Sequence, residues 1–438
     1  MTAVAARSGP SLRGLSVSSW SVVAAFGCYF CMYLFRKPFT AARFEDGTLW
    51  GVGLKTIFVI AQVAGYTTSK FIGIRVVAQV RPHRRVFMLL GLVGLAELAL
   101  VLFAVTPPPY NAVWLIGNGL SLGMVYGMVL GFLEGRRHTE ALTAGLCTSF
   151  IVAGGVAKSV GTELLEKGVS EYLMPAAAGL LFAAPFLFFV WMLSRIPPPS
   201  AADVAARTER VPMSATDRWA FFCRYAIGLT LLVLMFLLIT ILRSVRDDFA
   251  PEIWSGLHEK ISPGLYARSE TLVAVFVLLL NGSVVFVRNN RNAFFFAMAV
   301  AIGGVLLIAA ALLALRAGVL SPFAFMVLHG LGVYLPYIAV HTTIFERLIA
   351  MTRDRGTIGY LMYLADSFGY LGYVVVLLTR NLTGFGTGDN FLGFFVGLSW
   401  GIVGLCLVSL IPCWWYFAVH PAARPTAVAE PVLLEVQP

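Results

Sequence analysis

Runs of about twenty mainly apolar residues recur along the whole chain, and they constrain its fold more than any other feature. A helix needs about 20 such residues to cross the hydrocarbon core of a membrane. Twelve runs reach this length: 17–41, 48–74, 86–106, 111–134, 140–165, 172–194, 219–246, 269–288, 292–316, 321–346, 355–381 and 392–418. Because lipid offers the backbone no hydrogen-bond partner, such a run crosses the membrane as a helix. The sequence therefore predicts an all-α membrane protein with twelve transmembrane helices.

The composition agrees with a membrane protein. Of the 438 residues, 59% are hydrophobic and 12% are charged, whereas a soluble domain carries about 25% charged residues. The formal net charge of +10 would favour nucleic-acid binding in a soluble protein. Here most of the basic excess lies in the short connections between runs. We therefore expect the lipid bilayer as a partner and no nucleic acid.

A polar stretch rich in proline and alanine divides the runs into six and six. It covers residues 194–218, so we predict a six-helix bundle over 17–193, a linker over 194–218 and a second bundle over 219–418. The tails are 1–16 and 419–438. TAGLCTSFIVAGGV (143–156) also aligns with TIGYLMYLADSFGY (357–370), which indicates an internal repeat. Fused repeats of this kind are typical of transporters whose site lies between the halves, near mid-membrane.

Basic residues predict the orientation. Arginines gather in the connections that follow runs two, four, six, eight and ten, for example in 75–85, 136–137 and 347–355. Connections rich in lysine and arginine lie on the cytoplasmic side of a membrane. Both termini and the linker are therefore predicted to be cytoplasmic.

Ionisable residues inside the runs are the main functional signal, because charges in the membrane usually face a cavity and mark a substrate or ion route. The ten residues are Arg36, Lys37, Lys55, Lys70, Glu97, Lys158, Glu163, Arg224, Arg243 and Asp366. Cations outnumber anions, which favours an anionic cargo. Lys55 and Arg224 lie near the ends of runs and are predicted to reach the membrane surface. Lys158 lies five residues before Glu163, and we predict that the two are neighbours, with Lys158 lining the cavity.

Arg36 has two possible placements. It lies about 28 Å along the helix axis from Val17, which favours a side chain that reaches the membrane surface beyond Pro38. However, Arg243 occupies the corresponding late position in the first run of the second half. Two such guanidinium groups facing one cavity would clamp an oxyanion, because each donates paired hydrogen bonds and keeps its charge. The correspondence favours the clamp.

A polar stripe marks the eleventh run. Tyr363, Asp366, Tyr370 and Tyr373 share one helical face, which either lines the cavity or forms a hydrogen-bonded seam with another helix. Asp366 is the best candidate for a proton-coupling carboxylate. His341 either shares that task or is a buried histidine with satisfied hydrogen bonds.

Three short motifs resemble the organophosphate:phosphate antiporters of the major facilitator superfamily. The motifs are Tyr29, Tyr33, Arg36 and Lys37 in the first run, Lys70 within GYTTSKFIG in the second, and Arg243, Asp248 and Pro251 in the seventh. The resemblance implies the major facilitator fold, with two pseudo-symmetric halves of six helices, in a bacterial cytoplasmic (inner) membrane. It also implies that Arg36 and Arg243 bind the phosphate of the cargo. Lys37 and Lys70 would then lie in the substrate site, with Tyr29 and Tyr33 shaping the pocket.

The sequence thus favours a secondary transporter that exchanges small organic anions, phosphate-bearing ones in particular, by alternating access. One alternative is a proton-coupled carrier of a neutral or cationic solute that uses Asp366 and the membrane glutamates. Another is a receptor that uses the same fold without transport. The sequence has no nucleophile elbow, metal-ligand spacing or phosphate loop, so we expect neither an enzyme nor a cofactor or metal. Nothing in it indicates an obligate protein partner.

Overall fold

The computed structural model describes residues 12–45, 47–80, 84–133, 139–197, 215–352, 358–383 and 391–420. The predicted tails and the predicted linker lie largely outside these residues. In the first half the elements are α1 (Leu12–Leu34), η1 (Pro38–Ala41), β1 (Thr48–Leu49), β2 (Val52–Gly53), α2 (Leu54–Gln79), α3 (Arg85–Val105), α4 (Ala112–Leu122), α5 (Val125–Leu133), α6 (Thr139–Glu166) and α7 (Met174–Ser194).

The second half repeats this plan. Its elements are α9 (Ala215–Arg224), α10 (Ala226–Asp248), α11 (Ala250–Gly256), α12 (Pro263–Gly282), η3 (Ser283–Phe286), α13 (Asn290–Arg316), α14 (Pro322–Ala339), the π-helical turn η4 (Val340–Ile344), α15 (Phe345–Thr352), α16 (Ile358–Thr383) and α17 (Phe391–Val419). The strands β1 and β2 form a two-residue antiparallel hairpin, and Trp50 and Gly51 close it with positive φ angles, as a type I′ turn requires.

These elements confirm the predicted helical membrane architecture. Within the described residues they form twelve long helical segments, one for each apolar run, because α4 with α5, α9 with α10, and α14 with α15 each follow one run. Eight of the twelve are long and apolar enough to cross a membrane by these two criteria. The other four are α1, α2, α6 and α16, of which the last three carry charged side chains into the bundle.

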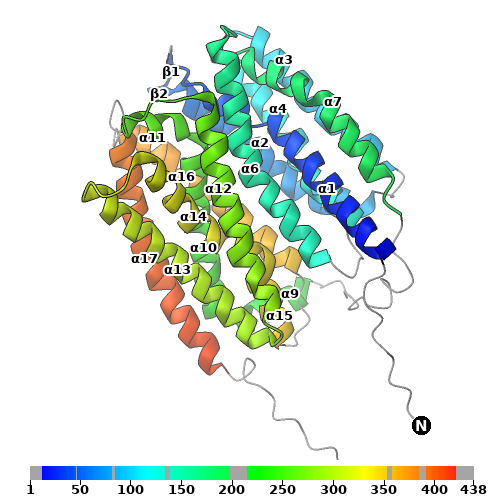
Figure 1. Cartoon of the computed structure of the whole chain (residues 1–438), viewed down its shortest axis with the longest axis vertical. Helices are drawn as coiled ribbons and strands as arrows, with labels where there is room; N and C mark the ends of the chain where they lie inside the picture. Colours follow the sequence, from blue (N-terminus) through cyan, green and yellow to red (C-terminus); the bar gives the residue numbers. More distant parts are fainter. Residues whose placement is uncertain are drawn as a thin grey trace, which may run out of the picture.

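The two halves pack in the same way. In the first half α1 contacts α6 and α7, α2 contacts α4, and α3 contacts α4 and α7. In the second half α10 contacts α16 and α17, α12 contacts α14, and α13 contacts α14 and α17. Each helix of the first half therefore has a counterpart with equivalent neighbours. The two bundles lie side by side in Figure 1, from blue to blue-green and from green to red.

Among the described residues, two pairs of long helices make the main contacts between the halves. The larger contact is between α6 and α12, and the smaller one is between α2 and α16. These pairs are equivalent under the internal repeat, because α6 corresponds to α16 and α2 corresponds to α12. At one end of the molecule η1 also contacts α11. Figure 1 shows α11 at this upper end together with β1 and β2, and α9 and α15 at the opposite end.

Candidate functional site

A helix break places Arg36 inside the bundle. Pro38 has no N–H and its ring collides with the carbonyl four residues earlier, so α1 ends at Leu34 and a short 3-10 turn follows. Two of the backbone carbonyls at the break accept hydrogen bonds from side chains instead. The amide of Asn118 donates to the carbonyl of Phe35 at 2.9 Å, and that of Gln62 donates to the carbonyl of Arg36 at 2.9 Å. Side chains from α4 and α2 thus satisfy the unwound backbone, as a membrane interior requires.

The depth of this break decides between the two placements of Arg36. Gln62 lies eight residues into α2, which is about 12 Å along the helix from Leu54. Arg36 is only 4% exposed. It therefore lies within the bundle and does not reach the membrane surface.

Aromatic rings surround the guanidinium group of Arg36. Its central carbon lies 3.7 Å from the centroid of the Tyr66 ring and 5.8 Å from that of Tyr33. Tyr29 packs edge-on against Tyr33 at 5.5 Å and against Tyr126 at 5.4 Å. The faces of such rings carry partial negative charge and stabilise a cation without neutralising it.

Arg243 has an equivalent environment in the second half. It lies in the last turns of α10, is 7% exposed, and places its guanidinium carbon 4.6 Å from the centroid of Tyr337. Its Nη2 also donates to the hydroxyl of Ser244 at 3.4 Å. Tyr33 and Tyr370 each lie close enough to both Arg36 and Arg243 to affect their electrostatic environment. The two arginines therefore flank one group of tyrosines contributed by both halves.

The two arginines differ from the lysines in having no ion-pair partner among the residues that the structure describes. Among the described residues, neither guanidinium group forms an ion pair, and the Nε atom of each lacks a hydrogen-bond partner. A buried charge without an acidic partner is costly, and such groups cluster at functional sites.

Lys37, next to Arg36, belongs to an ion cluster that crosses the halves. Its Nζ lies 2.7 Å from Oδ2 of Asp247 and also pairs with Asp248. Lys158 from α6 pairs with the other oxygen of Asp247. The hydroxyl of Tyr373 donates to Asp248 at 2.9 Å. All these side chains are buried.

Two further lysines of the first half bind carboxylates of the second. Lys55 lies 2.6 Å from Glu252 and donates to the carbonyl of Thr40 at 3.0 Å, so its ammonium group is bound within the protein. Lys70 on α2 pairs with Asp366 on α16. His341 completes this second group, with its Nε2 3.9 Å from Asp366.

The charges at the interface are segregated by half. The first half supplies four lysines and the second half supplies four carboxylates: Lys37, Lys55, Lys70 and Lys158, and Asp247, Asp248, Glu252 and Asp366. These eight formal charges cancel. Arg246 is compensated within the second half by Glu270, at 2.8 Å. Arg36 and Arg243 therefore leave two uncompensated positive charges among the described residues of the interface.

The predicted site residues thus fall into three neighbouring groups. Arg36, Arg243, Tyr29, Tyr33 and Tyr370 form the aromatic group, Lys70, Asp366 and His341 form a second, and Lys37 and Lys158 belong to the ion cluster. Tyr363 lies in α16, but its side chain is outside the part of the chain that the structure describes. Lys158 and Glu163 are not paired with one another, because Lys158 binds Asp247 and Glu163 binds Lys167.

Several residues that hold the arginines and the broken helix were not among the predicted site residues. Tyr66 and Tyr337 hold the guanidinium groups, and Gln62 and Asn118 hold the broken helix. Tyr66 could have been found, since it lies one helical turn before Lys70. The amides had no such signal, because their partners are backbone carbonyls far away in the sequence.

Comparison with known proteins places the chain in a family and a fold. Residues 38–420 match a family described as "Family of unknown function (DUF5690)". The chain belongs to this family. No curated protein matches the sequence.

Solved transporters share the fold of this DUF5690 member. A D-xylose-proton symporter matches with a TM-score of 0.59 and 12% identity, over 91% of this chain and 97% of that one. The nucleoside transporter NupG matches with a TM-score of 0.58 and 14% identity, over 92% and 100%. A bacterial homologue of the iron transporter ferroportin, in an outward-facing state, matches with a TM-score of 0.57 and 14% identity, over 91% and 99%. The chain therefore has the major facilitator fold, and these identities show the fold alone.

Proposed function

We propose that this protein is a secondary transporter that carries a small organic anion with two negative charges, such as a phosphate monoester, by alternating access. In this proposal residues 17–193 and 219–418 are the two moving halves. Residues 194–218 and both tails face the cytoplasm of a bacterium, with the protein in its inner membrane. Arg36 and Arg243 bind the anion, as the motifs shared with the organophosphate:phosphate antiporters imply.

One observation carries the proposal: two buried arginines, one from each half, share tyrosine neighbours and form no ion pair with any described residue. The acidic residues around them are already bound to lysines. A dianion between the two guanidinium groups would compensate the remaining charge, and the forked donors of arginine fit the oxygens of a phosphate. Because a cargo of this charge removes the repulsion between the arginines, it also allows the halves to close around it.

The experiment has two steps. Purified protein is first screened by thermal shift against inorganic phosphate, glycerol phosphate, succinate and acetate, because a ligand that binds the folded state raises the melting temperature. Each stabilising ligand is then tested for exchange in proteoliposomes. We expect exchange of a dianion that is lost in Arg36→Gln and Arg243→Gln and is largely lost in Arg36→Lys, which keeps the charge but not the fork. Full exchange in both glutamine variants would refute the clamp.

A second candidate is a proton-coupled carrier, and the Lys70–Asp366–His341 group favours it. Asp366 is buried and lies beside two titratable side chains, Lys70 and His341. Its Oδ1 accepts no hydrogen bond from the described residues. Uptake driven by a proton gradient, lost in Asp366→Asn but retained in the arginine variants, would support this carrier. Ligand binding without uptake or exchange in proteoliposomes would instead indicate a receptor.

A further inference from the structure

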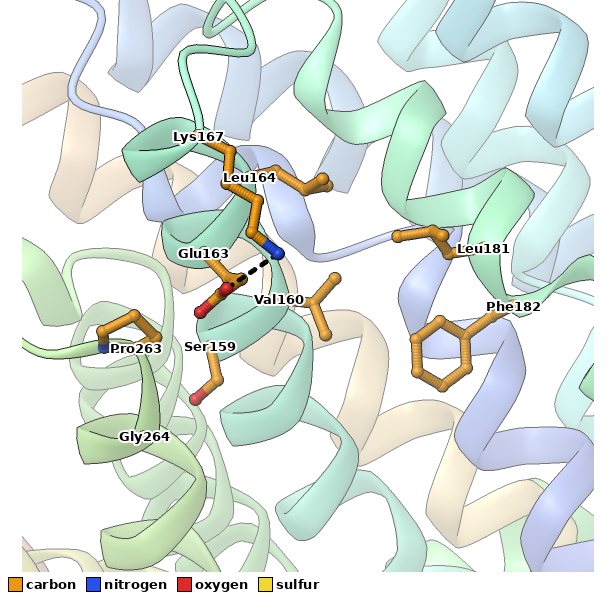
Figure 2. Close-up of a pocket in the computed structure, with 9 residues that line it drawn as sticks. All are labelled: Ser159, Val160, Glu163, Leu164, Lys167, Leu181, Phe182, Pro263 and Gly264. Atoms are coloured by element: carbon orange, nitrogen blue, oxygen red, sulfur yellow. Dashed lines mark ion pairs between the residues drawn. The ribbon is translucent and has the colours of Figure 1, made fainter.

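A crevice of about 470 Å³ lies outside the interface that holds the arginines. It is bounded by α6 and α7 of the first half and by the start of α12 of the second half (Figure 2). Val160, Leu164, Leu181 and Phe182 form its apolar wall. Its volume is in the range of small-molecule sites, which is about 300–1,000 Å³.

The crevice opens on a surface that faces lipid. Leu181 itself is 59% exposed, and Leu187 on the same helix is 54% exposed. On the other side, Val275 and Leu279 of α12 are also exposed. Since exposed apolar helix faces of a membrane protein contact acyl chains, the space between them is filled from the bilayer.

Charged groups line the rim of the crevice. Glu163 and Lys167 form an ion pair at 2.9 Å on the last turn of α6, and both side chains are largely exposed (Figure 2). Gly264 lies in the first turn of α12, and the Nε atom of Arg268 lies 3.6 Å from the position that a Cβ of Gly264 would take. Ser262 makes no side-chain cap for this helix, whose start carries partial positive charge. The rim therefore offers the paired Glu163 and Lys167 at the end of α6, and Arg268 and the helix start on α12.

The rim lies at the end of a helix that is longer than the membrane core. The 28 residues of α6 span about 42 Å, compared with about 30 Å for the hydrocarbon core, so a helix of this length can place its last turn among the headgroups. The apolar wall begins one turn deeper, at Leu164 and Val160. This order, charged at the rim and apolar below, matches a phospholipid.

We propose that the crevice binds one phospholipid with an ethanolamine headgroup. An acyl chain lies against Leu181 and Phe182, the phosphodiester lies by Lys167 and Arg268, and the ammonium lies by Glu163. This lipid bridges the two halves, because α6 and α12 meet beside it, where the hydroxyl of Ser159 accepts the N–H of Ala267 at 3.0 Å. The proposal depends on the fold and not on the identity of the cargo.

Native mass spectrometry of the full-length protein tests the proposal, with dioleoyl phosphatidylethanolamine and dioleoyl phosphatidylglycerol added separately. We expect the ethanolamine lipid to be retained in preference. Leu181→Trp fills the crevice and should abolish the retention of one lipid, whereas Leu187→Trp adds the same bulk on the same helix away from it. Retention that is equal for both tryptophan variants, with equal thermal stability, would overturn the proposal.

The headgroup is tested by a milder variant that leaves the core untouched. Glu163→Gln should lower retention of the ethanolamine lipid about threefold to fivefold, the effect of one exposed ion pair, and should leave the glycerol lipid unchanged. Lys167→Ala should lower the retention of both lipids, because both carry the phosphodiester. Equal retention of the two lipids by the unmodified protein, together with no effect of Glu163→Gln, would refute the ethanolamine assignment.

Discussion

The ion cluster around Lys37 should control closure of the end of the molecule where η1 meets α11. Lys37 belongs to the first half, and its partners Asp247 and Asp248 belong to the second. Opening this end must separate them. Lys37→Met keeps the length and apolar stem of the side chain and removes only the ammonium group. The variant should therefore favour the open arrangement.

The size of this shift depends on the partners that Asp247 and Asp248 keep in the Lys37→Met variant. Removing one partner of a buried ion pair costs about 3–5 kcal/mol when the other charge is left alone. Here Asp247 keeps Lys158, and Asp248 keeps the hydroxyl of Tyr373 at 2.9 Å. We therefore expect Lys37→Met to lower the free energy of opening this end by about 2 kcal/mol, which is roughly a 30-fold shift of the equilibrium toward the open arrangement.

Distances between spin labels measure this equilibrium directly. Trp50→Cys in the β1–β2 turn and Ser255→Cys in α11 place exposed labels on opposite halves at this end, in a background without the native cysteines. The Lys37→Met distance distribution should gain a longer component. Arg43→Met is the control, because Arg43 pairs with Glu45 of its own half at 3.4 Å.

A double-mutant cycle makes the test stricter. Lys37→Met and Asp248→Asn remove two ends of one contact, so the double variant should shift the equilibrium by less than the sum of the single shifts. Additive shifts, or a distance distribution that Lys37→Met does not change, would show that the cluster does not hold this end closed.

Three further predictions concern packing, coupling and cargo charge. Gly119→Ala should lower the stability by about 1–3 kcal/mol in thermal melting, because its Cβ would meet the backbone of Gln62, whereas Gly117→Ala, with no atom closer than 3.9 Å, should not. Asp366→Asn should leave Lys70 without its partner and slow transport more than cargo binding, and equal losses in both assays would contradict a coupling role. Affinity for a phosphate monoester should rise with pH through about 6, where the ester becomes a dianion. Affinity for a sulfate monoester, a single anion throughout, should stay constant, and parallel pH profiles would contradict dianion binding.

The helices were predictable because each of them leaves a local signal. Every apolar run contains a helix, and the ends of α3, α6 and α17 agree with the runs to within about one residue. The first, second, seventh, eighth and tenth runs agree less well, and α1 ends seven residues before its run because of Pro38. In the eighth and tenth runs, the helices extend over polar residues such as Arg268 and Arg347, which we had predicted to lie in the connections between runs. Hydropathy marks the apolar core of a span and not the polar turns that continue it.

The ion pairs were not predictable, because they join residues far apart in the sequence. Lys37 and Asp248 are 211 positions apart, and Lys70 and Asp366 are 296 apart. Sequence proximity was misleading: Lys158 is five residues from Glu163 yet binds Asp247. Lys55 lies at a helix end, and its ion pair with Glu252, which is 197 positions away, left no signal in the sequence. A single sequence shows which charges are buried and not which ones meet.

The placement of lysines in the first half and carboxylates in the second explains how the two halves can hold together and still separate. If these lysines and carboxylates were paired within each half, the contact between the halves would be apolar, and an ionic cargo would not affect it. Here each half alone has unpaired charges of one sign, four lysines in the first and four carboxylates in the second. The halves therefore attract each other at several places at once, and any separation exposes ions that only water or a partner can satisfy. Arg36 and Arg243 are the exception, since neither forms an ion pair among the described residues. In the proposed mechanism a dianion between them would supply the ionic contact that both lack.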